Sequence, residues 1–321
     1  MYQSERLSFT GYLIPVIQRA CAAYGVGDLV AFVPIETGCE DYNLKIETTS
    51  GKYVLKILAN FRTPAEELHY INVLEAVRDA GVAHPRVLNT NNGGIAFLDS
   101  GMRMILMEYV DGRDFFALSR VPNDTELDFI CGQIAKINKI KIPEFQDMAF
   151  GYWNVENMHK TFNEARKFLN PSDTKLVTRA MGEFDTIPVD KLPRAFCHRD
   201  MIKTNFIKTD KNLFVIDFSA GNVYPKIYDL AVVIYALMFD GIHSIPEITK
   251  KVVGFYNKYE KLTDIEIEFL PKFSLGCATM ELIGSVRWKY LSNQKIREID
   301  DLINLGRQNL NLYFNNPKIY Q

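Results

Sequence analysis

The chain has 321 residues, of which 47% are hydrophobic and 24% are charged, and its formal net charge is −2. This length is enough for two lobes with sizeable cores, and the balanced charge gives no broad basis for binding nucleic acid or an anionic membrane surface. The longest strongly apolar run, Leu230 to Phe239, is far too short to span a bilayer, so we expect no membrane association.

The five cysteines are scattered along the chain and contain no CxxC pair. This spacing predicts reduced thiols in a cytoplasmic protein. Residues 1–10 lack the basic start and apolar core of a signal peptide, which favours the same location. The sequence leaves open whether the protein is a monomer or a homodimer.

The first third of the chain has the pattern of a strand-rich lobe. A helix is predicted over 7–24, where Pro15 would kink or restart it. Short apolar runs bounded by turn residues predict five strands, with a hairpin at Ser50-Gly51. The predicted strands cover 29–36, 43–50, 52–58, 93–99 and 102–110.

One further helix is predicted over 64–81, inserted after the third strand. Pro64 lies in its first turn and Gly81 closes it. Helical spacing predicts that Leu68, Ile71 and Leu74 supply its buried face.

After Asp111-Gly112 helical patterns dominate. The predicted helices cover 124–140, 155–169, 173–184, 229–239, 246–260, 264–291 and 295–314. A short strand pair, 205–209 and 213–218, interrupts them. We therefore predict an α+β chain with a β-rich lobe over residues 1–110, a connector near 108–112 and a larger helical lobe over 111–321.

The segment FCHRDMIKTNFI, Phe196 to Ile207, concentrates polar residues between apolar neighbours. Asn205 follows Asp200 by five residues, and Asp217 ends an apolar strand twelve residues further on. Oxygen ligands such as those of Asn205 and Asp217 suit Mg²⁺, which also binds substrate phosphates. Asp200 is then free to accept a proton from an attacking hydroxyl. This division of roles is that of phosphoryl transfer.

HRDMIKTN followed by VIDF resembles the catalytic loop and metal-binding aspartate of the protein-kinase-like fold. The chain is most similar to the superfamily of aminoglycoside phosphotransferases, choline kinases and homoserine kinases, and the resemblance covers nearly its whole length. The matching segments are TGCEDYNLKIET, YVLKI, AGVAHPRVL, ILMEYVDG and YDLAVVI. EFLPKFSLGCATMELIGSVRWKYL resembles homoserine-kinase-like members specifically. The resemblance implies a bilobal fold with a five-stranded antiparallel β lobe, ATP or GTP as co-substrate, Mg²⁺, and a small-molecule hydroxyl acceptor.

The resemblance also implies roles for residues of the first lobe. Lys56 would hold the α- and β-phosphates, and the hairpin at Gly38 would cover them, although the full G-x-G-x-x-G signature is missing. Glu67 lies on the predicted inner face of the 64–81 helix and is the expected ion-pair partner of Lys56, with Glu66 as the alternative. Both glutamates could instead favour the helix N-terminus through its dipole.

By the same resemblance, Met107 would border the adenine, and the Glu108 carbonyl and the Val110 amide would contact the base edge. In the second lobe, Asp229 would brace the catalytic loop and His198 would pack as a structural residue. Each of these positions could equally be an ordinary strand end, helix cap or core residue.

Arg199 is typical of protein kinases, whereas small-molecule kinases more often have a small residue there. The span from Asp217 to Asp229 is only 12 positions, which leaves no room for a protein-kinase activation segment. Lys203 also lies three residues after Asp200, where protein Ser/Thr kinases generally place their lysine two residues after. These features favour a small-molecule acceptor.

The late-helix resemblance favours homoserine or another amino alcohol as the acceptor. Aminoglycosides and choline are alternatives, and choline would require an aromatic cage. The candidate contacts, all of which could equally be core or surface residues, are Tyr152, Trp153, Glu281, Arg287 and Trp288. A nucleotide-binding pseudokinase is the alternative of another class, although it would need none of the catalytic groups.

Overall fold

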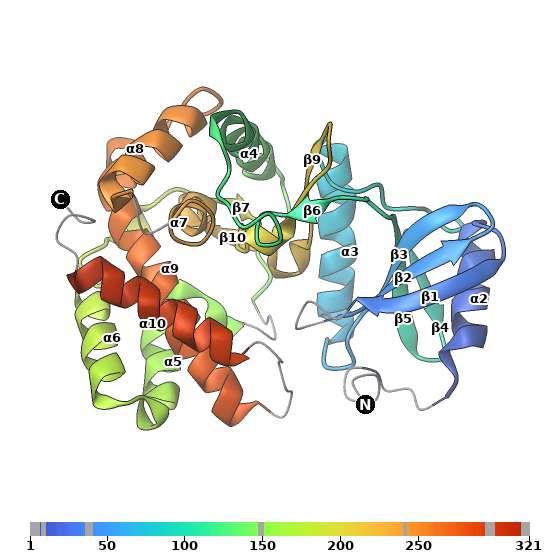
Figure 1. Ribbon diagram of the computed structural model, residues 1–321, viewed down its shortest axis with the longest axis horizontal. Coiled ribbons are helices and arrows are strands. Elements are labelled where there is room, and N and C mark those ends of the chain that lie inside the picture. The colour runs from blue at the N-terminus through green and yellow to red at the C-terminus, as the bar shows by residue number, and fades with distance from the viewer. Residues whose placement is uncertain are drawn as a thin grey trace. The chain divides into compact units, whose positions relative to one another are not determined.

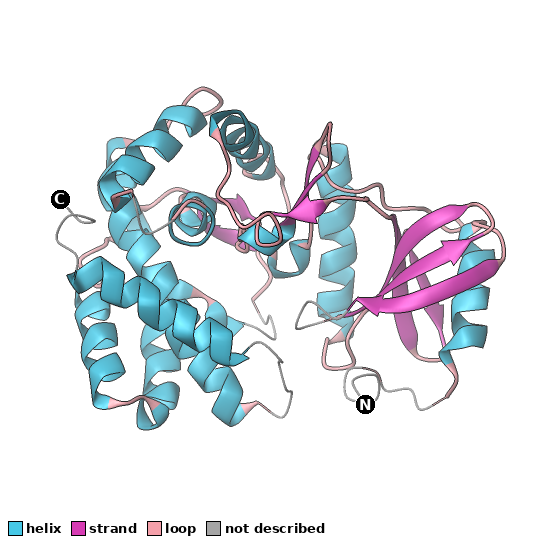
Figure 2. Ribbon diagram, viewed as in Figure 1, coloured by secondary structure: helices cyan, strands magenta, loops and turns pink. Residues whose placement is uncertain are grey.

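The computed structural model describes residues 7, 11–35, 41–146, 151–239, 243–292 and 299–315. The described residues group into two compact units. The first runs up to Gly112 and includes Phe214–Ile216, and the second comprises Arg113–Leu213 and the residues from Asp217 onward. Figure 2 shows that the first unit contains the large sheet and that helices dominate the second.

A five-stranded antiparallel sheet forms the centre of the first unit, with strand order β1-β2-β3-β5-β4. Its strands are β1 (Leu29–Ile35), β2 (Tyr42–Thr48), β3 (Gly51–Ile57), β4 (Ala96–Asp99) and β5 (Met102–Glu108). All five lie within or beside the predicted ranges, so the predicted β-rich fold with an inserted helix is confirmed.

Helix α2 (Leu13–Tyr24) covers one face of this sheet. Ile17, Leu44, Leu55 and Met104 are fully buried in the shared core. The Tyr24 hydroxyl contacts the backbone carbonyls of Ile95 and Met104 at 2.9 Å each, which fastens the end of α2 to the sheet. The helix begins at Leu13, later than predicted, so Pro15 lies in its first turn, where proline needs no intrahelical partner.

Helix α3 (Pro64–Asp79) begins at a capping box in which Thr63 and Glu66 exchange hydrogen bonds. The predicted buried face of this helix is right at Leu74, which is 1% exposed, and wrong at Leu68, which is 58% exposed. The buried side chains follow a helical series centred on the neighbouring stripe, namely Glu66, His69, Tyr70, Val73, Leu74 and Val77. Sequence spacing alone could not separate the two phases, because the true face carries polar residues.

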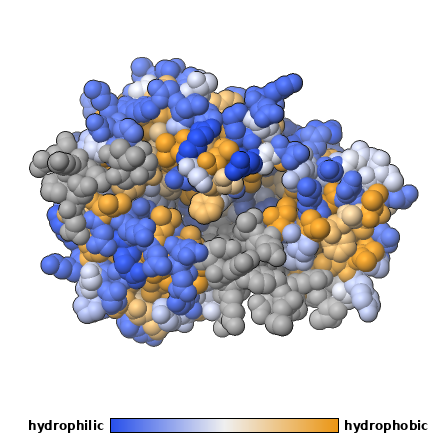
Figure 3. All heavy atoms as spheres, viewed as in Figure 1, coloured by the Kyte–Doolittle hydropathy of each residue, from blue (hydrophilic) through white to orange (hydrophobic). Residues whose placement is uncertain are grey.

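Strand β1 is an edge strand, and none of its residues is fully buried. Val30 and Val33 are 63% and 55% exposed. Orange, apolar spheres accordingly gather over the first unit in Figure 3, on the side where β1 faces the viewer in Figure 1. The strand therefore contributes hydrogen bonds to the sheet more than apolar core.

The second unit is built around helix α9, whose bounds, Asp264–Leu291, are those predicted. Figure 1 shows α5, α6, α7 and α10 arranged along α9. The helices of this unit are α4 (Asp124–Ile137), α5 (Met158–Ala165), α6 (Pro171–Phe184), α7 (Tyr228–Val232), α8 (Ile245–Tyr256), α9 and α10 (Ile299–Asn315). Among the described residues, no helix combines the length and the apolar character needed to cross a membrane.

Close packing against α9 depends on two of its glycines. A Cβ atom at Gly276 would lie 2.4 Å from the Phe184 ring, and one at Gly284 would lie 2.5 Å from the Trp153 ring. Both distances are far below van der Waals contact. These glycines therefore allow two aromatic rings to lie directly on the helix backbone.

The helix predicted over 229–239 is divided in the structure. It consists of α7 followed by a π-helical turn, η7 (Val233–Leu237). π-Turns occur frequently at functional sites, where they redirect side chains. Tyr235 belongs to this turn.

Short strands support the polar loop that the sequence singled out. β7 (Arg194–Cys197) pairs with β10 (Asn222–Pro225), and β6 (Arg113–Asp114) pairs with β8 (Phe206–Lys208). β9 covers Leu213–Val215, where the Val215 amide donates to the Ala83 carbonyl at 2.8 Å. The sequence predicted β8 and β9, but not β6, β7 or β10, because these runs are too short to show a period of two.

Candidate active site

The loop that follows β7 is fixed by Asp229. The two oxygens of this buried carboxylate accept the backbone N–H groups of His198 at 2.9 Å and Arg199 at 2.7 Å. Burial raises the pKa of the Asp229 carboxyl to about 7, although both hydrogen bonds oppose that rise. The His198 ring packs 4.4 Å from the Phe218 ring, and its Nδ1 accepts the Asp200 N–H at 3.2 Å. Asp229 and His198 therefore hold the loop in shape, in keeping with the structural roles expected of them.

Asp200 and Asn205 lie together in the structure. The side-chain Nδ2 of Asn205 donates to the Asp200 backbone carbonyl at 2.8 Å and to its carboxylate Oδ2 at 2.7 Å. Asn205 ends a single 3-10 turn, η5 (Lys203–Asn205), which brings it back toward the loop.

The surroundings of the Asp200 carboxyl shift its pKa upward. Burial and the nearby charge of Asp217 raise its pKa to about 6, while the Asn205 hydrogen bond and the Arg199 charge oppose the shift. A base whose pKa lies just below neutrality is ionised at working pH and still accepts a proton readily. Arg199 is itself buried, with its guanidinium 5.7 Å from the centre of the Tyr224 ring.

Asp217 occupies an unusual backbone conformation. Its φ of 64° and ψ of 73° lie in the left-handed region, which residues other than glycine rarely adopt. The carboxylate accepts the Ser219 N–H at 3.4 Å, at the start of the 3-10 turn η6 (Phe218–Ala220). Strained conformations of this kind cluster at functional sites, where they aim a side chain.

Asn205 and Asp217 fit a divalent cation by their chemistry. The Asn205 amide nitrogen is used on Asp200, so its side-chain oxygen is the atom that remains for a ligand. The repulsion between Asp200 and Asp217 that raises the Asp200 pKa would be relieved by a cation. No group of three or more His, Cys, Asp or Glu suited to a metal exists among the described residues. Such a cation would therefore need phosphate oxygens and water as further ligands, as Mg²⁺ does.

In the first unit, Lys56 is buried beside Asp41. Its Nζ lies 3.2 Å from Asp41 Oδ2, and both side chains are almost inaccessible. Arg62 donates to the same carboxylate at 2.8 and 3.1 Å, and the Tyr70 ring lies 5.5 Å from Lys56 Nζ. Two cations thus share one carboxylate in this cluster. Asp41 and Arg62 were not predicted as site residues, because a lone Asp or Arg in a polar stretch of sequence is typical of a solvated surface charge.

The predicted ion pair between Lys56 and Glu67 is absent. The Glu67 carboxylate instead accepts the Arg103 guanidinium at 2.7 Å and is partly exposed. The reason is the phase of α3, which turns Glu67 toward β5 and places Glu66 on the buried face. Glu66 is 4% exposed and accepts the Thr63 N–H at 2.9 Å.

Lys56 and Met107 share one face of the sheet, opposite to the face that α2 covers. Lys56 pairs in register with Asn43 and Ile105, and Met107 pairs with Val54. Directly paired residues lie on the same face, so a continuous patch runs from Lys56 to Met107. The buried side-chain oxygen of Asn43 has no hydrogen-bond partner within the described residues. Asn43 therefore leaves one buried acceptor unsatisfied on the Lys56 face of the sheet.

The connector begins at the end of β5. The Glu108 N–H donates to the Arg86 carbonyl at 2.9 Å, and the two side chains form an exposed ion pair at 2.7 Å. For the Val110 N–H, no hydrogen bond is found in the described part of the chain. The contacts of the Glu108 carbonyl and the Val110 amide with a base edge stay predictions.

Two predicted positions cannot be placed. Gly38, the expected phosphate-covering glycine, lies outside the described residues, and the side chain of Tyr152 is not described. Among the other candidate acceptor contacts, Arg287 pairs with Glu164, and Trp288 is buried, which suits structural roles.

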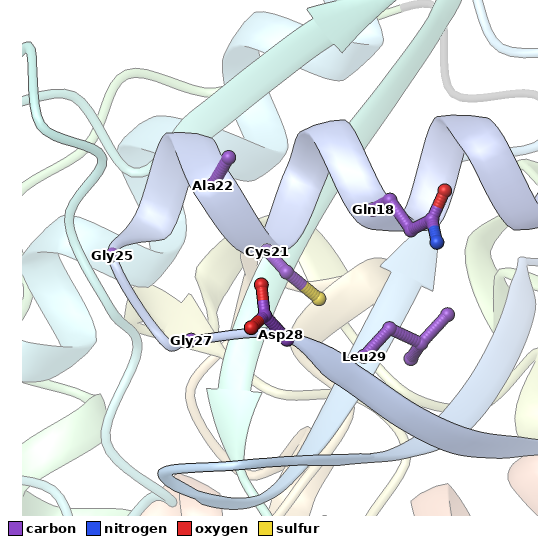
Figure 4. A pocket seen from close by; sticks show the side chains of 7 residues that line it. All are labelled: Gln18, Cys21, Ala22, Gly25, Gly27, Asp28 and Leu29. Carbon is purple, nitrogen blue, oxygen red and sulfur yellow. The ribbon is translucent and has the colours of Figure 1, made fainter.

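A cavity of about 360 Å³ lies between α2 and the start of β1. Figure 4 shows its lining, which consists of Gln18, Cys21, Ala22, Gly25, Gly27, Asp28 and Leu29. Cys21 is buried, and burial raises the pKa of its thiol, so the thiol is unreactive. The cavity adjoins α2, on the side of the sheet opposite to Lys56.

The fold and the loop around Asp200 define a phosphotransferase of the small-molecule kinase class, with a protein-kinase-like fold. The chain belongs to the APH phosphotransferase enzyme family, whose family model matches residues 31–247. The match spans both units and includes Lys56, Asp200, Asn205 and Asp217.

Known relatives agree with this class. The homoserine kinase of Rhodopseudomonas palustris strain BisA53 is 25% identical over 268 residues, which cover 81% of this chain and 80% of that protein. The structure of spectinomycin phosphotransferase APH(9)-Ia, in complex with ADP and spectinomycin, has a TM-score of 0.69 at 13% identity, covering 96% of this chain and 100% of that one. The microcompartment-associated aminopropanol kinase has a TM-score of 0.67 at 15% identity, with coverages of 96% and 99%.

Proposed function

We propose that this protein transfers the γ-phosphate of ATP to the hydroxyl group of a small amino alcohol, with homoserine as the first candidate acceptor. The observation that carries the proposal is the Asp200–Asn205–Asp217 arrangement, which combines a carboxylate base with two oxygen ligands for a metal. The homoserine kinase relatives and the aminopropanol kinase neighbour support an acceptor of this kind.

In this proposal Asp200 orients the acceptor hydroxyl and takes its proton as the oxygen attacks the γ-phosphorus. Asn205 and Asp217 hold Mg²⁺, which when bound neutralises charge on the phosphates. Asn205 additionally fixes the Asp200 carboxylate by its 2.7 Å hydrogen bond, so that one oxygen remains for the acceptor. Asp229 keeps the loop rigid through two backbone bonds.

The first unit would contribute nucleotide binding. Lys56 donates to the phosphates, and Asp41 holds its ammonium group in place before the nucleotide arrives. Met107 borders the base, and the Glu108 carbonyl and the Val110 amide contact the edge of the base. Glu66, on the buried face of α3, remains the candidate for a second partner of Lys56.

The test is an ADP-release assay with ATP and with GTP across homoserine, other amino alcohols, choline and aminoglycosides. We expect turnover with homoserine or an amino alcohol and its loss in Asp200→Asn. Turnover only with an antibiotic would reassign the protein to the antibiotic phosphotransferases, which the spectinomycin phosphotransferase neighbour represents. Nucleotide binding without turnover of any acceptor would instead indicate a pseudokinase.

The cellular setting and the assembly also belong to this proposal. Cys21, Cys131, Cys197 and Cys277 are buried and free, which supports a reducing, cytoplasmic setting. The sequence left monomer and homodimer open, and light scattering on the purified protein would distinguish the two.

A further inference from the structure

Asp41 is a buried carboxylate that two cations of the first unit share. Arg62 donates to it from two nitrogen atoms, from Nε to Oδ1 at 2.8 Å and from Nη2 to Oδ2 at 3.1 Å. Lys56 contacts it through Nζ, at 3.2 Å from Oδ2. A planar guanidinium that binds both carboxylate oxygens is a stronger and more directional partner than a single ammonium contact on a flexible stem. Of the two cations, Arg62 therefore holds Asp41 more firmly.

The backbone around this carboxylate fixes the position of Arg62. The Ala59 N–H donates to Asp41 Oδ1 at 3.1 Å, and the Ala59 carbonyl accepts the Arg62 N–H at 3.1 Å. Arg62 directly precedes the N-cap of α3. The Tyr70 ring of that helix lies 5.7 Å from the Arg62 guanidinium carbon and 5.5 Å from Lys56 Nζ. The start of α3 and the end of β3 are thus joined through one carboxylate and one aromatic ring.

Phosphate binding by Lys56 has a cost at Asp41. An ammonium group that turns to the phosphates of a nucleotide withdraws one cation from a carboxylate that is only 2% exposed. A buried carboxylate that loses its counter-charge is strongly destabilised. Because Arg62 binds both oxygens of Asp41, the carboxylate keeps a cation after Lys56 has left. Arg62 therefore lowers the free energy that the exchange requires.

We infer that Arg62 is a positioning residue for phosphate binding, which retains the Asp41 carboxylate while Lys56 exchanges that carboxylate for the phosphates of the nucleotide. The inference rests on the proposed function, in which Lys56 binds the phosphates. It adds a residue that acts on the nucleotide only through Asp41. Without Arg62, Lys56 would be the one of these two cations that remains on Asp41, and its ammonium group would be less available to the phosphates.

The test compares ADP with adenosine, which lacks the phosphates, by isothermal titration calorimetry on the full chain with Mg²⁺ present. The readout is the ratio of the Kd for adenosine to the Kd for ADP, which isolates the contribution of the phosphates and requires no acceptor. The variants are Arg62→Met, Asp41→Asn and the double variant that combines them. The control is Arg103→Met, because Arg103 pairs with Glu67 on the same helix α3.

We expect the ratio to fall about 10-fold in Arg62→Met, because Lys56 then stays on the Asp41 carboxylate. In the double variant residue 41 carries no charge, so the ratio should recover from its value in Arg62→Met although two groups have been changed. Arg62→Lys keeps the charge and should retain most of the ratio, and Arg103→Met should retain all of it. Circular dichroism and melting curves establish that each variant is folded. Arg62→Gln, which is also neutral, repeats the test if Arg62→Met does not fold.

An unchanged ratio in Arg62→Met, including an equal loss of affinity for ADP and adenosine, would overturn the inference while the phosphotransferase function stands. A double variant whose ratio is no higher than that of Arg62→Met would do the same, since a purely structural role predicts that the two losses add. A wild-type protein that binds ADP no more tightly than adenosine would instead overturn the phosphate-binding role of Lys56 in the proposed function itself.

Discussion

The side-chain amide of Asn205 donates to the Asp200 carboxylate at 2.7 Å. This bond joins the residue expected to bind metal to the residue expected to act as base. Replacing Asp200 by Asn keeps the shape of the side chain but removes the proton acceptor. We expect kcat to fall by about 10²- to 10⁴-fold in the ADP-release assay, while calorimetry detects unchanged nucleotide binding. Retention of wild-type kcat would contradict the assignment of Asp200 as base.

Asn205→Ala should have two separable effects. It removes one candidate metal ligand, so the Mg²⁺ concentration for half-maximal activity should rise at saturating ATP. It also frees the Asp200 carboxylate, so kcat should stay below the wild-type value even at saturating Mg²⁺. Chelation of divalent cations should abolish wild-type activity, and added Mg²⁺ should restore it. Full activity after chelation would exclude the metal role of Asn205 and Asp217.

The pH dependence of kcat/KM should report Asp200. The base acts only when ionised, so activity should rise with pH through about 6 and level off above. The Arg199 charge lowers the pKa of Asp200, so Arg199→Met should move this rise to higher pH and Arg199→Lys should not. A rise that stays in place in Arg199→Met would mean that Arg199 does not act on Asp200.

Asp41→Ala should destabilise the first unit. The substitution removes the carboxylate with which buried Lys56 and Arg62 pair. Breaking a buried ion pair in this way typically lowers the free energy of unfolding by about 3–5 kcal/mol. Glu67→Gln is the matched control, because its ion pair with Arg103 is partly exposed and should contribute about 0–1 kcal/mol. Denaturant unfolding monitored by circular dichroism gives both values. Equal effects would contradict the structural role of Asp41.

Gly284→Ala should damage acceptor binding. The added methyl group would lie 2.5 Å from the Trp153 ring and must displace it, so the KM for the acceptor should rise several-fold while the KM for ATP stays constant. Gly254→Ala in α8 meets no atom within 4 Å and should raise helix stability by up to about 1 kcal/mol without kinetic effect. Steady-state kinetics of both variants gives the KM for the acceptor and the KM for ATP. An unchanged KM for the acceptor in Gly284→Ala would show that Trp153 does not contribute to acceptor binding.

Much of the fold could be predicted from sequence because its elements are long and regularly patterned. The bounds predicted for α9 are those observed, and all five strands of the main sheet were located. The failures have local causes. The buried face of α3 was shifted because polar Glu66 and His69 take core positions, and strands of two to four residues carry no usable period.

The residues of the candidate site were also predictable only in part. The loop motif predicted Asp200, Asn205 and Asp217 as site residues, because their spacing lies within one short segment, and the structure joins Asp200 and Asn205 by a hydrogen bond. The partner of Lys56 was not predictable from helix spacing, because Asp41 lies on a different part of the chain and β2 brings it across to β3.

Asp217 and the Asp200 loop belong to one small ribbon. From Asp217 the chain passes through η6 into β10, which pairs directly with β7, the strand that leads into the loop. Only two residues then separate β10 from α7, where Asp229 secures that loop. This ribbon contains no insertion that phosphorylation could reposition. A substitution anywhere along this ribbon would therefore be transmitted to the Asp200 loop through hydrogen bonds that directly adjoin it.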